Sequence, residues 1–551
     1  MNKEIKRQVM GIDSSGQYGL FRGMGERKGK GRGQRDKGEA QRHFEDPSPR
    51  GILIGNESLG EYLIRAGQRR VFEIRQMLRS LQWGGFEAKY RGGGRRPYHP
   101  AALLGLILFG IMEGKSSLRQ LETMARTDVR SWWLTGGIAP DHSVIGRFLN
   151  DHAERLSEEF FESLTREVLK VTRSSTQSLA GDGTVVQAAA SRYRGVKQEA
   201  AEEAAKESRR RAEADPGDEK LGRQAEQAEG VAQAVRERVA TRKRQRSKKA
   251  KDAKVSPSEP EAVFQPLKDK SIAPSYKPTL LANQERIIVG QQVQASSETR
   301  GFGALLRQAK RINGGVKQLL LDAGFFLGKV METALEEGVE DLLCPEGATR
   351  GGSRKKKSSK GFAKSAFHYD EQSDCYECPA GEKLVPVGQS HDDGKRFTRY
   401  GGAPCQHCEL RDQCTSNPRG RTVKRYEDDE IKDALRGVMR HPAAQREYSR
   451  RKGMVEPVFS ELKGIQGLQR FRRRGLDKVR LEFALHATAH NLRRLVALTQ
   501  ASDKALERIS GAFWQLLQLP IGLFQGLRLL CARFSGEHHE NTSPHPSRVA
   551  A

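Results

Sequence analysis

Two aspartates in the sequence accompany short apolar runs and have a glycine close behind them. Asp182 lies within SLAGDGTVV, and Asp322 closes VKQLLLD. Short apolar runs bounded by turn residues favour buried strands, which hold a carboxylate in a fixed place. Mg²⁺ binds through one or two carboxylates together with water and phosphate oxygens. The two residues therefore indicate a divalent-metal site for phosphodiester chemistry; the plainer interpretation is a pair of turn or cap residues.

A third carboxylate is expected elsewhere, and Glu456 is the candidate. On a helix, Tyr448, Lys452 and Glu456 stand four residues apart on one face. Lys463 follows on nearly the same stripe, so that a carboxylate, a tyrosine and two cations would flank a phosphate backbone. Pro457 disfavours α geometry at Glu456 and could instead open a new helix. The plainer interpretation of Glu456 is a surface acid.

Five of the seven cysteines fall within residues 375–414. They form two C-x₂-C pairs and a single thiol, namely Cys375 with Cys378, Cys405 with Cys408, and Cys414. Two such pairs can supply four thiolates to a tetrahedral structural Zn²⁺. Five cysteines leave the choice of four open, with His407 as a weaker ligand and unliganded thiols as the alternative. So few cysteines, gathered in one place, favour a metal site in a reducing compartment over a disulfide scaffold.

The chain is strongly basic. Lys and Arg number 96 against 69 Asp and Glu, a net charge of +27. This excess predicts a polyanionic partner, most simply nucleic acid, and argues against cationic or apolar ligands. The sequence contains no uninterrupted apolar stretch of about 20 residues, so no membrane span is predicted. The N-terminus lacks the apolar core of a secretory signal.

The patterns divide the 551 residues into parts that would position these groups. We expect a disordered basic tail at 1–50, a helical DNA-binding domain at 51–178, a catalytic core at 179–349 and 430–495, a cysteine-rich insert at 350–429, and a C-terminal helix with a disordered tail at 496–551. Capping residues and prolines predict several short helices in the second part, which a plain helical bundle would also explain.

Strand-like and helix-like runs alternate in the core. Strands are expected within 178–191, 276–297, 316–323 and 341–344, and helices over 301–312 and 329–337. This order predicts a mixed α/β fold with Asp182 on the first strand and Asp322 at the end of a later one. The Ala/Glu/Lys/Arg-rich segment 194–260 predicts a helical basic insert.

Several stretches resemble the DDE transposases of bacterial insertion sequences, most of all the insertion sequence 1182 group, related to the insertion sequence 4/5 superfamily. They are GRRPYHPAALLGLILFGIMEGKSSLRQLE (94–122), WWLTGGIAPDHSVIGRF (132–148), GDGTVVQAAAS (181–191), LLLDAGFF (319–326), CPAGEKL (378–384), CQHCELRDQC (405–414), YSRRKGMVEPVFSELKGIQGLQRFRRRG (448–475) and AHNLRRL (489–495). Together they follow the family's order and cover most of residues 85–495.

The resemblance implies an α/β catalytic core with a ribonuclease-H-like mixed sheet and helices, which an all-α N-terminal domain would precede and a small zinc-binding insert would interrupt. Asp182, Asp322 and Glu456 would be the acidic triad that binds two Mg²⁺ ions, or Mn²⁺ in their place. Tyr448, Glu456 and Lys463 match the family's pattern around the glutamate. Arg451 and Lys452 both remain candidates for its arginine position.

The resemblance also selects zinc ligands and DNA contacts. The family-like cysteines are Cys378, Cys405, Cys408 and Cys414, with Cys375 as the alternative ligand. The residues expected to contact DNA are Tyr448, Arg451, Lys452, Lys463, Arg472, Arg473 and Arg474.

The implied activity is DNA transposition, with Mg²⁺-dependent cleavage at terminal inverted repeats and strand transfer into target DNA. The expected partners are double-stranded DNA and a second copy of the chain when two ends are synapsed. The expected location is the bacterial cytoplasm at the nucleoid, with no membrane partner. A catalytically inactive DNA-binding relative and a metal-dependent nuclease without strand transfer are the alternatives.

Overall fold

The computed structural model describes residues 44–517, except for 91–95, 245–248, 348–360, 363 and 393–394. The chain divides into two compact units, Met1–Arg494 and Leu495–Ala551. Most of the tail expected at 1–50, and the chain after Leu517, lie outside the described residues. No helix within the described ranges is both long and apolar enough to cross a membrane.

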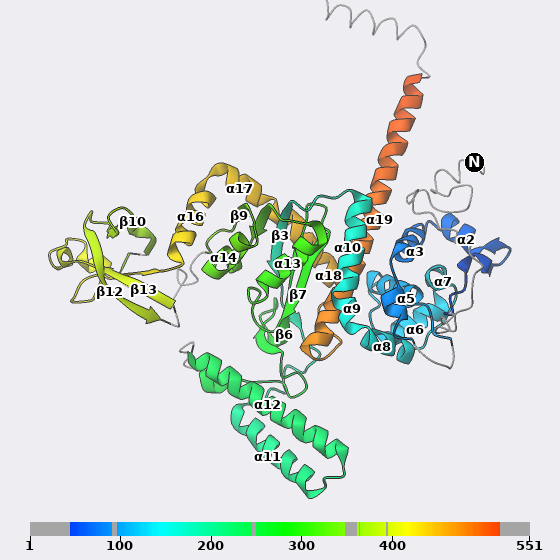
Figure 1. Ribbon diagram of the computed structural model, residues 1–551, viewed down its shortest axis with the longest axis horizontal. Coiled ribbons are helices and arrows are strands. Elements are labelled where there is room, and N and C mark those ends of the chain that lie inside the picture. Colours follow the sequence, from blue (N-terminus) through cyan, green and yellow to red (C-terminus); the bar gives the residue numbers. More distant parts are fainter. Residues whose placement is uncertain are drawn as a thin grey trace, which may run out of the picture. The chain divides into compact units, whose positions relative to one another are not determined.

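Nine short helices follow one another between residues 59 and 172 of the described chain (Figure 1). They are α2 (Leu59–Arg65), α3 (Arg70–Ser80), α4 (Gly84–Glu87), α5 (Pro100–Met112), α6 (Leu118–Thr127), α7 (Val129–Thr135), α8 (His142–Asp151), α9 (Ala153–Ser157) and α10 (Glu159–Thr172). Ser58 and Ser117 begin α2 and α6 with capping boxes. Every residue of α5 is buried, so this apolar helix forms the centre of the group.

A small hairpin precedes these helices. Its strands β1 (Leu53–Ile54) and β2 (Glu57–Ser58) are joined by a turn in which Gly55 has a φ of 60°. The all-α expectation for this region therefore needs a correction, because strands of two residues are too short to give a periodic pattern in the sequence.

The central sheet contains seven strands of mixed direction. They are β3 (Ser178–Gly183), β4 (Val186–Gln187), β5 (Val263–Pro266), β6 (Ile272–Ala282), β7 (Ile288–Gln294), β8 (Gln318–Leu321) and β9 (Asp341–Leu343). β6 pairs antiparallel with β3 and β7, while β3, β8 and β9 run parallel to one another. The mixed α/β architecture is compatible with the predicted ribonuclease-H-like core.

Helices cover this sheet. α10 and α13 (Phe302–Asn313) contact β7, and α18 (Arg451–Gly464) contacts β3 and β6. α14 (Gly328–Glu336) connects β8 to β9. β6 is buried over almost its whole length, as expected for a strand covered on both faces.

Two further helices form a hairpin between β4 and β5. Figure 1 shows α11 (Gln198–Ala214) and α12 (Glu219–Arg244) side by side. They bury a narrow stripe of alanines and valines against each other. At its base, the backbones of Val196 and Val255 exchange hydrogen bonds of 2.9 and 3.0 Å. The hairpin therefore leaves the core through a paired neck.

A separate five-stranded antiparallel sheet follows β9. Its strands are β10 (His368–Asp370), β11 (Cys375–Glu377), β12 (Lys383–Asp392), β13 (Lys395–Gly401) and β14 (Val423–Tyr426), in that order across the sheet. It has a small core of its own, made of Phe367, Tyr376, Leu384, Tyr400 and Val423. The cysteines lie on and beside these strands.

The chain returns to the central sheet through three helices. They are α16 (Asp429–Arg440), α17 (Pro442–Ser449) and α18. The last helix, α19 (Leu476–Leu517), continues past residue 495 without a break. The stretch contains no proline before Pro520, so nothing in the sequence stops the helix there.

Candidate active site

The parallel pairing of β3 with β8 brings two of the predicted carboxylates together. Gly181 lies opposite Leu321 in the parallel pairing. Asp182 and Asp322 directly follow these two residues, so they are neighbours at the same end of the sheet. A Cβ atom on Gly181 would lie 2.5 Å from the Leu321 side chain. The glycine therefore permits the tight packing beside Asp182.

Asp182 is a largely buried acid with one buried cation beside it. Burial raises the pKa of its carboxyl to about 6, Arg451 opposes this rise, and the charge of Asp322 adds to it. Arg451 Nη2 lies 3.1 Å from Asp182 Oδ1, and Arg451 Nε donates to the Gly181 carbonyl at 3.3 Å. Of the two cations that compete for the arginine position, Arg451 contacts Asp182, whereas Lys452 is exposed.

Asp322 directly follows β8 and caps a short 3₁₀ turn. Its Oδ1 accepts a hydrogen bond of 2.9 Å from the Gly324 N–H. The Cys344 thiol donates to the Asp322 carbonyl at 3.1 Å. No sequence pattern singles out Cys344, because its position beside Asp322 depends on the pairing of β9 with β8.

Glu456 lies inside α18, which runs without interruption through Pro457. Pro457 has no N–H to donate to the Gly453 carbonyl. Arg286 Nε donates to that carbonyl instead, at 3.2 Å. This replacement explains why the helix does not restart at Glu456, the alternative that the proline suggested.

Asp182 and Glu456 line the same cavity, which has a volume of about 1400 Å³. Basic side chains line it as well, namely Arg192, Lys268, Lys463 and Arg470. Asp322 is absent from the lining residues of this cavity. Arg192 and Lys268 come from connecting segments with no periodic pattern, so the sequence could not have assigned them to the site.

Lys463, which lines the same cavity as Asp182, is held by the segment that follows β3. Its Nζ donates to Thr184 Oγ1 at 2.6 Å and to the Val185 carbonyl at 3.0 Å. Burial lowers the pKa of Lys463 to about 8, and the charge of Lys268 acts in the same direction. Burial raises the pKa of Tyr448, which is half-buried at the end of α17.

The three consecutive arginines at 472–474 differ in their surroundings. Arg472 Nε donates to Ser116 Oγ at 2.9 Å, and the backbone N–H groups of Arg472 and Arg473 donate to the buried Glu482 carboxylate. Burial lowers the pKa of Arg473. Arg474 is exposed. The segment is therefore tied into the fold, and a role in DNA binding stays a prediction.

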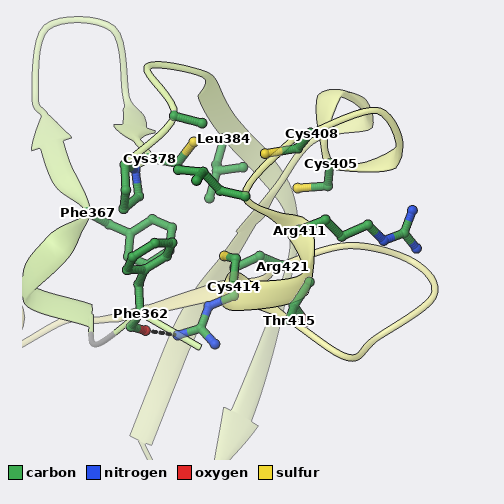
Figure 2. A pocket seen from close by; sticks show the side chains of 13 residues that line it. Phe362, Phe367, Cys378, Leu384, Cys405, Cys408, Arg411, Cys414, Thr415 and Arg421 are labelled. Atoms are coloured by element: carbon green, nitrogen blue, oxygen red, sulfur yellow. Dashed lines mark hydrogen bonds between the residues drawn. The ribbon is translucent and has the colours of Figure 1, made fainter. Parts of the chain in front are cut away.

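Four of the five clustered cysteines line one pocket (Figure 2). The sulfur atoms of Cys378, Cys405, Cys408 and Cys414 turn toward the same space. Burial raises the pKa of the Cys414 thiol, Arg421 opposes this rise, and the three other cysteines add to it. Cys375 is buried in β11, and neither it nor the exposed His407 lines the pocket.

The carboxylates at the sheet and the thiols in the insert are the two sets of expected metal ligands. Among the residues that the structure describes, no three His, Cys, Asp or Glu side chains form a group that could hold a metal ion. Metal binding by the carboxylates and by the thiols therefore stays a prediction.

Two family models match parts of the chain. A transposase DDE domain matches residues 377–496, and a transposase domain (DUF772) matches residues 63–151. Both models describe transposases. These matches support a bacterial insertion-sequence transposase that acts on DNA. The transposase DDE match contains Glu456, whereas Asp182 and Asp322 lie outside both matches; no curated protein and no solved structure matches the chain.

Proposed function

We propose that the chain is a DDE transposase of the insertion sequence 1182 group that cuts DNA at the terminal repeats of its element and joins the freed ends to target DNA. The adjacency of Asp182 on β3 and Asp322 directly after the parallel strand β8 carries this proposal. Asp182 also shares a large cavity with Glu456 and with four basic side chains. Neighbouring carboxylates at a phosphate-binding surface are the arrangement that two-metal phosphodiester chemistry uses.

The proposed triad of Asp182, Asp322 and Glu456 has the donor atoms that suit Mg²⁺ or Mn²⁺. It offers only oxygen donors, which hard divalent cations prefer. The like charge of Asp322 and the burial of Asp182 both disfavour an ionised Asp182, and a bound cation would relieve both effects. Metal ions bound there would lower the pKa of water and stabilise a leaving oxygen.

The chain's own cations would hold the DNA. Arg451 fixes the Asp182 carboxylate from the buried side, while Lys463 fixes the segment after β3. Arg470 and Lys268 on the cavity wall would neutralise the phosphates next to the scissile bond. Tyr448 at the end of α17 and Lys452 at the start of α18 would contact the same strand.

The proposed reaction has two steps. Hydrolysis breaks the P–O3′ bond at the end of the element and leaves a 3′-OH. That oxygen then forms a new bond to a target phosphorus as the target's own P–O3′ bond breaks. Two ends would require at least two copies of the chain, acting at the nucleoid.

We also propose that the cysteine-rich insert binds a structural Zn²⁺. Cys378, Cys405, Cys408 and Cys414 line one pocket, and four thiolates are a standard donor set for tetrahedral zinc. The insert's own core consists of five side chains, so a metal would add substantially to its stability.

The test is cleavage of labelled DNA that carries the flanking terminal repeats, with Mg²⁺ or with EDTA. We expect nicks at the repeat boundary that require Mg²⁺ and that Asp182→Ala and Asp322→Ala abolish, while DNA binding is largely retained. Asp341→Ala is the matched control, because Asp341 lies opposite Gln318 at the other end of the sheet. Binding without cleavage under any divalent ion, or equal loss of binding and cleavage in Asp182→Ala, would contradict the proposal.

A further inference from the structure

Tyr193 stands out among the exposed side chains. It is 88% exposed, and no other aromatic residue of the described chain is among the large exposed hydrophobic side chains. Arg192 and Arg194 flank it. Arg192 lines the cavity that also contains Asp182 and Glu456. An unpacked aromatic ring between two cations therefore lies next to the proposed active site.

The loop that carries Tyr193 is fixed on its N-terminal side. Arg470 donates to the Ala188 carbonyl through Nε at 3.1 Å and to the Ala190 carbonyl through Nη2 at 3.2 Å. Ala190 is itself buried. Arg470 lines the cavity as well, so the same side chain connects the cavity wall to the base of the loop.

The loop is also fixed on its C-terminal side. A Cβ atom on Gly195 would lie 2.7 Å from the Phe264 ring, so the backbone is seated directly on β5. Val196 then pairs with Val255 at the neck of the helical hairpin. Four residues, 191–194, separate Ala190 from Gly195. The short loop is therefore held at both ends before DNA binds, and binding does not have to pay for ordering it.

We propose that Tyr193 stacks on an unpaired base of the DNA whose phosphates occupy the cavity. This inference rests on the proposed function and adds the form of DNA that the site accepts. Inside a duplex both faces of every base are covered by neighbouring bases, and a terminal base pair has one free face. An aromatic ring can therefore insert beside a base fully only where that base has left the duplex. Stacking tolerates any base sequence, and the two flanking arginines supply the charge that holds the backbone.

The test compares two fluorescent duplexes of one sequence, one with a fully paired end and one with a frayed end. Full-length protein is titrated with each in Ca²⁺ buffer. The wild type is expected to bind the frayed duplex more tightly. Tyr193→Ala should weaken binding to the frayed duplex by about 5- to 100-fold and leave binding to the paired duplex unchanged, while Tyr193→Trp should retain the preference.

Val438→Ala is the matched control, since Val438 is a 48% exposed hydrophobic residue on α16 and does not line the cavity. A 2-aminopurine in the frayed segment gives a direct readout, because stacking on the ring quenches its fluorescence in the wild type and not in Tyr193→Ala. Equal binding of both duplexes by the wild type, or unchanged binding and quenching in Tyr193→Ala, would overturn the inference alone. A wild type that binds neither duplex would overturn the proposed function with it.

Discussion

Arg451 is the side chain on which the state of Asp182 depends most directly. Its side chain is 8% exposed, and its guanidinium contacts both the Asp182 carboxylate and the Gly181 carbonyl. Lys452, the next residue, points into solvent. In the family's pattern the arginine stands three residues after the tyrosine, which matches Arg451, and four residues before the glutamate, which matches Lys452. Adjacent residues of a helix point about 100° apart, so the two candidates face different surroundings. Spacing alone could not choose between them, because α17 ends at Ser449 and a new helix begins at Arg451.

We expect Arg451→Gln to lower the free energy of unfolding by about 3 kcal/mol, because it leaves Asp182 in a buried site without its cation. Lys452→Gln should change the free energy by less than about 0.5 kcal/mol, as is usual for an exposed side chain. Urea denaturation of the two variants beside the wild type measures both effects. Equal losses of unfolding free energy in the two variants would show that the buried ion pair does not contribute the predicted stability.

At the scale of elements, the strands that carry the aspartates could be predicted, and their register could not. The runs 178–183 and 318–321 are apolar enough to be recognised as buried strands. Neither run predicts that Gly181 pairs with Leu321. This register depends on the packing of the Leu321 and Leu281 side chains around Gly181. The adjacency of Asp182 and Asp322 is therefore a result of the fold.

The cysteine-rich insert shows a second limit of sequence patterns. The sequence did not predict its five strands, because their buried aromatic residues alternate with lysines and arginines that cover the rings. Arg425 lies 3.5 Å from the centroid of the Tyr369 ring, and Lys424 lies 4.3 Å from that of Phe397. Such cation–π pairs let a polar sequence build a sheet with a small core.

We expect the purified protein to contain one zinc ion per chain, which Cys405→Ser should remove because Cys405 lines the four-thiol pocket. Cys375→Ser should retain the zinc, because Cys375 lies in β11 outside that pocket. Elemental analysis of reduced, folded protein measures the metal. Zinc loss in Cys375→Ser alone would mean that the ligand set includes Cys375, and a zinc-free wild type would exclude the site.

At the scale of the molecule, the excess positive charge is unevenly distributed. The helical hairpin is rich in arginine, yet Arg209 and Arg236 pair with Glu229, and Arg210 and Arg211 pair with Glu207. Much of its charge is therefore neutralised within the hairpin. The cavity beside β3 has four basic residues and three acidic ones, which makes it the better candidate for the phosphate backbone.

The whole fold also responds to acid through His486, a residue of α19. His486 is 1% exposed, its Nδ1 lies 2.8 Å from Gln466 Oε1, and burial lowers its pKa to about 3. In the unfolded chain a histidine has a pKa of about 6.5. Below that pH the unfolded state takes up a proton that the folded state excludes, so stability falls as the pH decreases from about 6.5 toward 3.

We expect this single group to reduce the free energy of unfolding by about 2 kcal/mol between pH 7 and pH 5. In His486→Gln, which has no group to titrate, the loss over the same interval should be smaller by that amount. Denaturation curves of both proteins at the two pH values measure the difference. Parallel losses would show that other groups account for the acid sensitivity.

The neck formed by Val196 and Val255 has a consequence for how the chain tolerates change. The two points where the helical hairpin leaves and re-enters the core are hydrogen-bonded neighbours, so their separation does not depend on what lies between them. A folded module whose own termini lie close together could replace the hairpin without stretching the central sheet. The neck is thus a grafting point, at which a fluorescent reporter or a tethering domain could be carried beside the cavity.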